Sequence, residues 1–215
     1  MGDQDIGNIR REYSRHKLDG ANMPSDPMEL FVAWLEQANV AGITDPTAMT
    51  LSTVDGQGNP SSRIVLLKKI EEGKLIFFTN YNSKKAHAIE ENARVATHFY
   101  WPELERQVKI AGTVSSVEDA VSDLYFQSRP YESKIGAWAS PQSEEIPNRQ
   151  YLEEAFEKSK KRFKESGNIP RPTHWGGYAI SPARVEFWQG GNHRLHDRIE
   201  YSKKQDQWNR VRLAP

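Results

Sequence analysis

The chain of 215 residues contains no cysteine, and this absence removes several kinds of chemistry. Disulfides, thiolate zinc sites, iron–sulfur clusters and cysteine nucleophiles all need a sulfur that the sequence does not supply. Any reaction must therefore use other side chains or a bound cofactor.

The sequence also lacks an excess of charge and any long apolar run. Its 29 Lys and Arg residues balance 29 Asp and Glu residues, so the positive field that attracts nucleic acid is absent. No apolar run approaches the roughly 20 residues that cross a bilayer, and the polar start MGDQDIGNIRREYSRHK lacks the apolar stretch of a secretory signal. We therefore expect a cytoplasmic protein with no membrane or nucleic-acid partner.

Dinucleotide loops and metal sites are not expected either. Gly56 and Gly58 precede a strand pattern rather than a helix, which indicates a hairpin turn. His193 and His196 lie three residues apart on a predicted strand, so their side chains would point to opposite faces. The 10% of aromatic residues, including six Trp, could line a site for a flat ring, or they could simply form core.

The elements that the sequence predicts are mostly strands joined by hairpins. A helix from Asp26 to about Asn39 has Asp26 as N-cap and Pro27 at its first position. Further helices are expected from Ser83 to about Glu91, from a capping box at Ser116 and Asp119 to about Gln127, and over Arg149 to Glu165. Strands are expected at Ala48–Val54, Arg63–Lys69, Lys74–Thr79, Arg94–Trp101, Arg106–Ser115, Gly177–Ile180, Val185–Trp188, Arg194–Tyr201 and Trp208–Leu213.

The turn formers between these strands favour an antiparallel sheet. DGQGN at 55–59 and EEG at 71–73 each join neighbouring strands as a hairpin turn. Because strands follow one another instead of alternating with helices, a closed or split antiparallel barrel is favoured over a parallel sheet. We therefore expect one mainly β domain of the α+β class.

The first candidate site lies in SRIVLLKK at 62–69 and TNYNSKKAH at 79–87. Lys84 and Lys85 stand where a helix begins, so two ammonium groups, backbone N–H groups and the Ser83 hydroxyl could meet a phosphate. A solvated helix start with Ser83 as its cap is the alternative. On a regular strand Arg63 and Lys68 would point to opposite faces about 16 Å apart, and would bind different anions unless a bulge intervenes.

Two further stretches carry cationic and hydrogen-bonding groups. In EFWQGGNHRLHDRIEY at 186–201, Arg194, His196 and Arg198 would share one strand face, which suggests a site for phosphate and a heteroaromatic ring. A charged edge strand that prevents sheet pairing is the alternative. The stretch 125–143 offers donors to phosphate or carbonyl oxygens, although alone it is typical of an irregular loop; they are Tyr125, Arg129, Ser133, Gln142 and Ser143.

Taken together, these stretches resemble the pyridoxine 5'-phosphate oxidase family. The resemblance extends over nearly the whole chain and rests on RREY at 10–13, DPTAM at 45–49, RIVLLK at 63–68, LERQV at 104–108, SRP and IGAW within 128–138, FWQGGNHRLHDR at 187–198 and RLAP at 212–215. It implies a homodimeric, antiparallel Greek-key split barrel with flanking helices and with FMN between the subunits. Residues 1–20 would form a flexible lid and 21–215 a single FMN-binding domain.

The resemblance also implies an activity and a role for each site residue. FMN would take a hydride from C4' of pyridoxine or pyridoxamine 5'-phosphate at its N5, and O2 would reoxidise it, giving pyridoxal 5'-phosphate, H2O2 and, from the amine, ammonia. The residues expected to bind FMN are Arg63, Ile64, Val65, Leu66, Lys68, Phe78, Thr79, Lys84, Lys85, Gln107, Gln142, Ser143, Trp188 and Arg198. The residues expected to bind substrate are Arg10, Tyr13, Lys68, Tyr125, Arg129, Ser133, Arg194, Leu195 and His196, with Arg194 and His196 also catalytic.

One residue departs from the family pattern, and two other functions stay open. Lys84 stands where arginine is expected, and lysine cannot offer a phosphate the bidentate fork of a guanidinium, which bears on flavin affinity. A flavin or pyridoxal-phosphate binding protein without turnover, or a reductase using a nicotinamide donor, could use the same fold.

Overall fold

The computed structural model describes residues 13, 18, 23–164 and 168–215. The contacts group the chain into two compact units. The first unit holds the described residues up to Thr47 together with 98–110 and 183–215, and the second holds 48–97 and 111–182, masked residues aside. The single domain over 21–215 and the lid over 1–20 stay predictions, and most of the lid lies outside the described residues.

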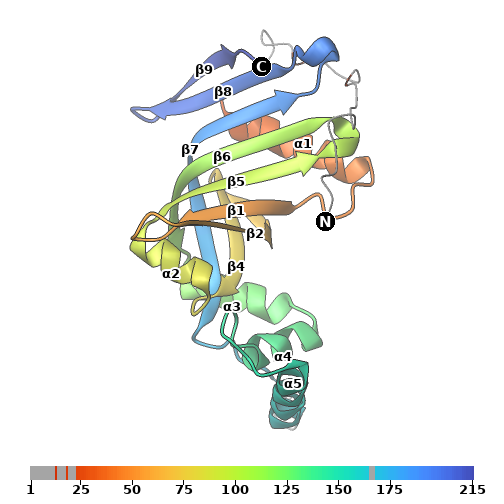
Figure 1. Ribbon diagram of the computed structural model, residues 1–215, viewed down its shortest axis with the longest axis vertical. Helices are drawn as coiled ribbons and strands as arrows, with labels where there is room; N and C mark the ends of the chain where they lie inside the picture. Colours follow the sequence, from red (N-terminus) through yellow and green to blue (C-terminus); the bar gives the residue numbers. More distant parts are fainter. Residues whose placement is uncertain (1–12, 14–17, 19–22, 165–167) are drawn as a thin grey trace, which may run out of the picture. The chain divides into compact units, whose positions relative to one another are not determined.

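The strands belong to one sheet, labelled in Figure 1. Within the described residues its order is β2-β1-β5-β6-β7-β4-β3, with β8 paired to β7 and β9 to β8. The pairs β1–β2, β3–β4, β4–β7, β7–β8 and β8–β9 are antiparallel. This confirms the mainly β, antiparallel fold class; the strands are β1 (Ala48–Val54), β2 (Pro60–Leu66), β3 (Lys69–Glu71), β4 (Lys74–Asn80), β5 (Arg94–Trp101), β6 (Arg106–Ser116), β7 (Trp175–Gln189), β8 (Asp197–Lys204) and β9 (Gln207–Leu213).

The first predicted hairpin forms, and its turn is held by an aspartate. The Asp55 carboxylate accepts from the backbone N–H groups of Gln57 at 3.0 Å and Asn59 at 2.8 Å. Gly58 adopts a φ of +87°, a backbone conformation that glycine reaches without steric cost. The turn formers at 55–59 therefore predicted the hairpin between β1 and β2, although not the bounds of β2.

The strand predicted over Arg63–Lys69 is wrong at its end. β2 stops at Leu66, Leu67 turns into the core, and the Lys68 N–H donates to Ile76 O of β4 at 2.8 Å. The chain thus exchanges β1 for β4 as its partner within two residues. Because Lys68 lies beyond the regular strand, the alternation argument that separated it from Arg63 does not apply to it.

The helices labelled in Figure 1 largely follow the sequence prediction. Asp26 caps the first helix by accepting from Met28 N at 2.9 Å. The capping box at Ser116 and Asp119 is wrong, because Ser116 is still in β6 and the N-cap is Glu118 without a side-chain hydrogen bond. The helices are α1 (Pro27–Val40), α2 (Lys84–Glu91), α3 (Asp119–Ser128), α4 (Tyr131–Ala139) and α5 (Arg149–Lys164), with short 3-10 turns η2 (Pro102–Leu104) and η3 (Asn192–Arg194).

Two other local predictions are also wrong. The irregular loop expected from Tyr125 onward is instead the end of α3 followed by α4. The strand expected over Arg194–Tyr201 begins only at Asp197, because His193 and Arg194 take φ values of +54° and +63°, outside the extended region. Arg194, His196 and Arg198 therefore do not form a row on one strand face. The prediction that His193 and His196 point to opposite faces of a strand is wrong as well, because both precede β8.

Each unit has its own buried core. In the first unit, the buried ring of Phe31 packs on Phe99 and that of Trp34 on Phe187. In the second unit a cluster joins α3, α4, α5 and the start of β7; it contains Phe126, Ile135, Ala137, Phe163, Ile169 and Trp175. Since Trp175 belongs to this cluster and also lines the candidate site described next, the core of the second unit reaches the wall of that site.

Candidate active site

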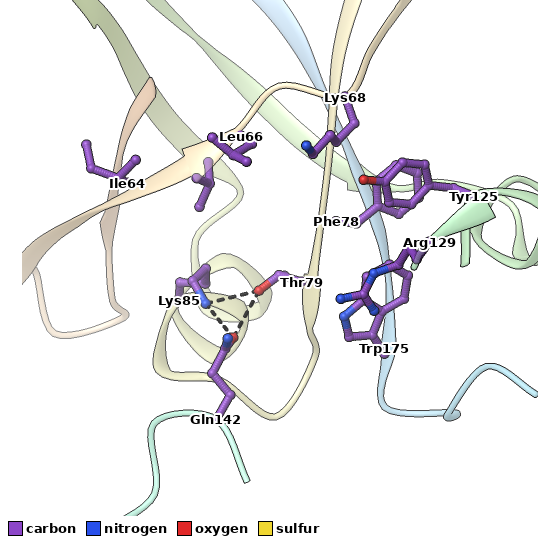
Figure 2. A pocket seen from close by; sticks show the side chains of 11 residues that line it. Ile64, Leu66, Lys68, Phe78, Thr79, Lys85, Tyr125, Arg129, Gln142 and Trp175 are labelled. Atoms are coloured by element: carbon purple, nitrogen blue, oxygen red, sulfur yellow. Dashed lines mark hydrogen bonds between the residues drawn. The ribbon is translucent and has the colours of Figure 1, made fainter. Parts of the chain in front are cut away.

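A pocket of about 290 Å³ lies within the second unit. Its wall comes from β2, β4, the start of α2, α3, the segment after α4 and the first residue of β7. All of its lining residues except Trp175 are site residues that the sequence analysis named. They are Ile64, Val65, Leu66, Lys68, Phe78, Thr79, Lys85, Tyr125, Arg129, Gln142 and Trp175, most of them labelled in Figure 2.

One polar group in the pocket is centred on the buried ammonium of Lys85. It donates to Thr79 Oγ1 at 3.0 Å, Ser83 Oγ at 3.0 Å and Gln142 Oε1 at 2.8 Å. All three acceptors are neutral. Burial, and secondarily the charge of Arg63, lower the pKa of Lys85 to about 8. The group is thus a costly cation that a bound anion would stabilise.

The other residues predicted to bind a phosphate near Lys85 differ in their hydrogen-bond partners and in their exposure. Arg63 donates from Nη1 to Leu51 O at 3.1 Å and to Thr53 Oγ1 at 2.9 Å, and burial lowers its pKa. The Ser83 hydroxyl does not cap α2, because it donates to Asn80 O at 2.7 Å. Lys84 and Ser143 are exposed and do not line the pocket.

A second polar group holds Lys68, Tyr125 and Arg129. Figure 2 shows these side chains apart from Lys85, Thr79 and Gln142, on the side of the pocket where Phe78 and Trp175 stack. Tyr125 stacks on Phe78 with ring centroids 3.9 Å apart, and its pKa is raised by burial. The predicted partner Ser133 lies on α4 and is not among the lining residues.

The first unit brings three predicted residues together around an aromatic contact. His196 lies 4.7 Å from Trp188 and 5.7 Å from Tyr13, measured between ring centroids. Its Nδ1 accepts from the Gly191 N–H at 3.2 Å, so the neutral imidazole carries its proton on Nε2. Gly190 is needed beside them, because a Cβ there would lie 2.7 Å from Tyr13 Cβ.

The other predicted residues of the first unit are placed differently. Arg198 binds Glu186 through Nε at 2.9 Å and Nη2 at 3.2 Å, so its charge is already paired. Gln107 Oε1 accepts from His98 Nε2 at 3.0 Å. Arg194 and Leu195 are exposed, the latter at 72%, and Arg10 lies outside the described residues.

Sequence reasoning missed Trp175, which proves to be part of the pocket wall. The guanidinium carbon of Arg129 lies 4.5 Å from the centre of its ring. Trp175 begins the strand β7 just before Gly176 and Gly177, and the latter accepts close contact with Phe78. The signal available was a tryptophan followed by two glycines at the start of a strand, which indicates close packing without specifying a partner.

The described part of the chain shows two further absences. Among its helices, none combines the length and apolarity that crossing a bilayer requires. Over the same residues, no group of three or more His, Asp or Glu side chains could hold a metal ion.

The antiparallel fold and the pocket define a class of protein. The sheet is that of split-barrel proteins, and the pocket pairs two cationic groups with stacked aromatic rings and exposed aliphatic residues of β2. Such a combination suits flat ligands that carry phosphate groups.

The comparisons with known proteins identify the family within that class. Residues 35–162 match the family described as "Pyridoxamine 5'-phosphate oxidase", and residues 175–215 match the "Pyridoxine 5'-phosphate oxidase C-terminal dimerisation region". The pyridoxine/pyridoxamine 5'-phosphate oxidase of Cytophaga hutchinsonii is 49% identical over 211 residues, covering 98% of both chains. That of Neisseria gonorrhoeae is 46% identical over 211 residues, covering 98% of this chain and 100% of the relative.

Solved structures agree with this assignment. PhzG from Burkholderia lata, solved with tetrahydrophenazine-1-carboxylic acid, has a TM-score of 0.88 at 29% identity and covers 94% of this chain and 100% of its own. A pyridoxamine 5'-phosphate oxidase-related, FMN binding protein from Nostoc punctiforme shares the fold at a TM-score of 0.70 and 18% identity, covering 90% and 100%. The chain belongs to the pyridoxamine 5'-phosphate oxidase family, and it is an oxidoreductase.

Proposed function

We propose that this chain is an FMN-dependent oxidase that converts pyridoxine or pyridoxamine 5'-phosphate to pyridoxal 5'-phosphate. The names of its relatives support the substrates, and the FMN-binding protein of the same fold supports the cofactor. The observation that carries the proposal is a pocket with two separate cationic groups, one at Lys85 and one at Lys68 and Arg129. Two cationic groups suit two phosphorylated rings.

The residues around Lys85 fit the phosphate of FMN. Lys85 is 8% exposed and its ammonium has only neutral acceptors, so a phosphate would offset its burial. Arg63 lies close enough to lower the pKa of Lys85, and Lys84 stands beside it at the start of α2. Ile64 and Leu66 are 63% and 37% exposed, which leaves an aliphatic surface for a flat ring system.

The group at Lys68, Tyr125 and Arg129 fits the phosphate of the substrate. Arg129 offers a guanidinium and the exposed Lys68 an ammonium, while the Tyr125 hydroxyl can donate a third hydrogen bond. Burial lowers the pKa of Arg129, so this cation too would gain from an anionic partner. Ser133, on the neighbouring helix α4, would complete the set.

The chemistry would come from the cofactor and the geometry from the protein. When bound, FMN would accept a hydride from C4' of the substrate and pass both electrons to O2, which leaves as H2O2. His196, held by Gly191 and the rings of Trp188 and Tyr13, would donate from Nε2 to the substrate ring. Arg194 would stabilise negative charge on the C4' substituent, and Tyr13 with Arg10 would close over the bound substrate.

The proposal includes a homodimer with FMN between its subunits. Residues 175–215, which contain Trp188, Arg194, His196 and Arg198, match the family's dimerisation region. The remaining flavin contacts in the proposal are Val65, Phe78, Thr79, Gln107, Gln142 and Ser143. Leu195 would contact the substrate ring.

One assay separates this function from its alternatives. The purified protein is loaded with FMN and mixed with pyridoxine 5'-phosphate, and pyridoxal 5'-phosphate formation and O2 uptake are followed together. The proposal predicts that both occur without a nicotinamide donor. A yellow protein with no turnover would be a binding protein, and reduction that depends on NADH would make it a reductase.

A further inference from the structure

The guanidinium of Arg129 is held by aromatic rings and not by a carboxylate. Its Cζ lies 4.5 Å from the centre of Trp175 and 5.5 Å from that of Phe126. Among the described residues, its Nη1 is buried and has no hydrogen-bond partner, and no ion pair to Arg129 is present. The Arg129 guanidinium is therefore held in place by the two rings, while its Nη1 still has N–H donors for a ligand.

This arrangement suits a site that must bind an anion. A carboxylate partner would neutralise Arg129 and compete with a phosphate for its N–H groups. The face of an indole attracts a cation through its quadrupole and leaves the in-plane N–H donors free. A buried donor without a partner is unfavourable, and the cost is relieved when a phosphate oxygen accepts from it.

Trp175 is itself fixed from several sides. It is 7% exposed and stacks nearly parallel to Phe78, with ring centroids 5.6 Å apart. Its backbone carbonyl accepts from Arg171 Nη1 at 2.7 Å. The same guanidinium binds Asp123 at 2.6 Å and Asp119 at 2.7 Å, both on α3, the helix that leads to Arg129. Arg171 thus links Trp175 to α3, the helix whose C-cap is Arg129.

We propose that Trp175 is a positioning residue for substrate binding: its ring orders the Arg129 guanidinium in advance for the phosphate of the substrate. This inference rests on the proposed function and adds to it a residue that acts on substrate binding through Arg129. Without the indole ring, the Arg129 side chain would sample other rotamers. Substrate binding would then have to fix the side chain, and the lost conformational entropy would weaken the affinity. The effect should therefore appear in KM and not in kcat.

The test compares Trp175→Leu with Trp175→Phe in the FMN-loaded enzyme. We expect Trp175→Leu to raise KM for pyridoxine 5'-phosphate by about 5- to 30-fold, the range of a cation–π contact, with kcat and FMN affinity within about twofold of wild type. Trp175→Phe keeps a ring and should recover much of the lost KM. It also keeps the test valid if the leucine variant folds poorly.

A matched control and a double variant distinguish the positioning of Arg129 from a general loss of packing in the second unit. Trp138→Leu removes another tryptophan of the same unit that lies under a guanidinium, that of Arg162 at 4.8 Å, but does not line the pocket. It should leave KM unchanged. In an Arg129→Ala background, Trp175→Leu should raise KM no further, because the residue it positions is gone.

Three results would overturn the inference: an unchanged KM in Trp175→Leu, an equal increase in Trp138→Leu, or additive effects of the Trp175 and Arg129 changes. Absence of turnover in the wild type would instead contradict the proposed function. Calorimetric titration with pyridoxal 5'-phosphate then tests Trp175 by itself: weaker binding by Trp175→Leu, recovered in Trp175→Phe, supports it, and equal binding overturns it.

Discussion

The buried ammonium of Lys85 should make the stability of the FMN-free protein depend on pH in a particular way. Burial lowers its pKa from 10.5 to about 8. Between these values the unfolded chain binds the proton and the folded chain does not, so the free energy of unfolding rises with pH. Below about pH 8 both states are protonated, and the folded state carries the full cost of the buried charge.

The size of this effect follows from the pKa shift. A difference of about 2.5 pH units corresponds to about 3 kcal/mol over the whole window. Between about pH 7.5 and 9.5, Lys85 alone should add about 2 kcal/mol to the free energy of unfolding. Bound FMN should remove this trend, since its phosphate keeps the ammonium protonated in the folded state as in the unfolded one, and FMN affinity should fall as the pH rises above about 8.

Chemical denaturation of FMN-free wild type and Lys85→Met across this pH range isolates the contribution. Other groups titrate in both proteins, so the difference between the two curves reports Lys85. Lys84→Met is the matched control, because Lys84 is exposed on the same helix turn. It should follow the wild type. If Lys85→Met and wild type gave parallel curves, the ammonium would not be the buried, unneutralised cation described here.

Three other substitutions test separate parts of the account. Arg129→Ala should raise KM for pyridoxine 5'-phosphate at least tenfold with little loss of kcat in steady-state kinetics, and an unchanged KM would remove Arg129 from the phosphate site. Arg194→Ala should lower kcat by about 10- to 1000-fold, and an unaltered kcat would exclude it from the chemical step. Gly177→Ala should lower the free energy of unfolding by roughly 1–3 kcal/mol, because its Cβ would lie 2.7 Å from Val117 Cγ2 and 2.8 Å from Phe78 Cε1; a variant as stable as wild type would show that these two side chains move aside freely.

Local signals in the sequence were sufficient for much of the fold. The Asp26 cap followed by Pro27, and the Asp55 turn with a glycine at positive φ, act within a few residues, so they can be identified without knowledge of the tertiary structure. The same holds for the hairpin at Glu72 and Gly73, where both residues take positive φ. Strand pairing between neighbours then follows from these turns.

The change of strand partner after β2 and the positive-φ turn at His193 and Arg194 could not be predicted from such local signals. β2 ends where Lys68 changes partner to β4, and this depends on a strand that comes later in the chain. The turn at His193 and Arg194 depends on Gly191, where a Cβ would lie 2.4 Å from Leu195 O. Such a close approach is visible only in the folded chain.

The site shows the same division between local and distant signals. Lys68, Lys85 and Arg129 were named from the sequence and line one pocket, although they come from β2–β3, α2 and the end of α3. The pairing of Arg198 with Glu186 and the stacking of Arg129 on Trp175 were missed. Both contacts join residues whose proximity is set by strand register or by packing of the second core, which no spacing rule encodes.

The central claim is that the pocket binds two phosphorylated rings, each through its own cationic group. The most direct test is the ratio of kcat/KM for pyridoxine 5'-phosphate to that for pyridoxine in the FMN-loaded enzyme. We predict a ratio of about a thousandfold or more, because pyridoxine would leave the donors of Lys68, Tyr125 and Arg129 without a partner. Equal values for the two substrates would contradict the account.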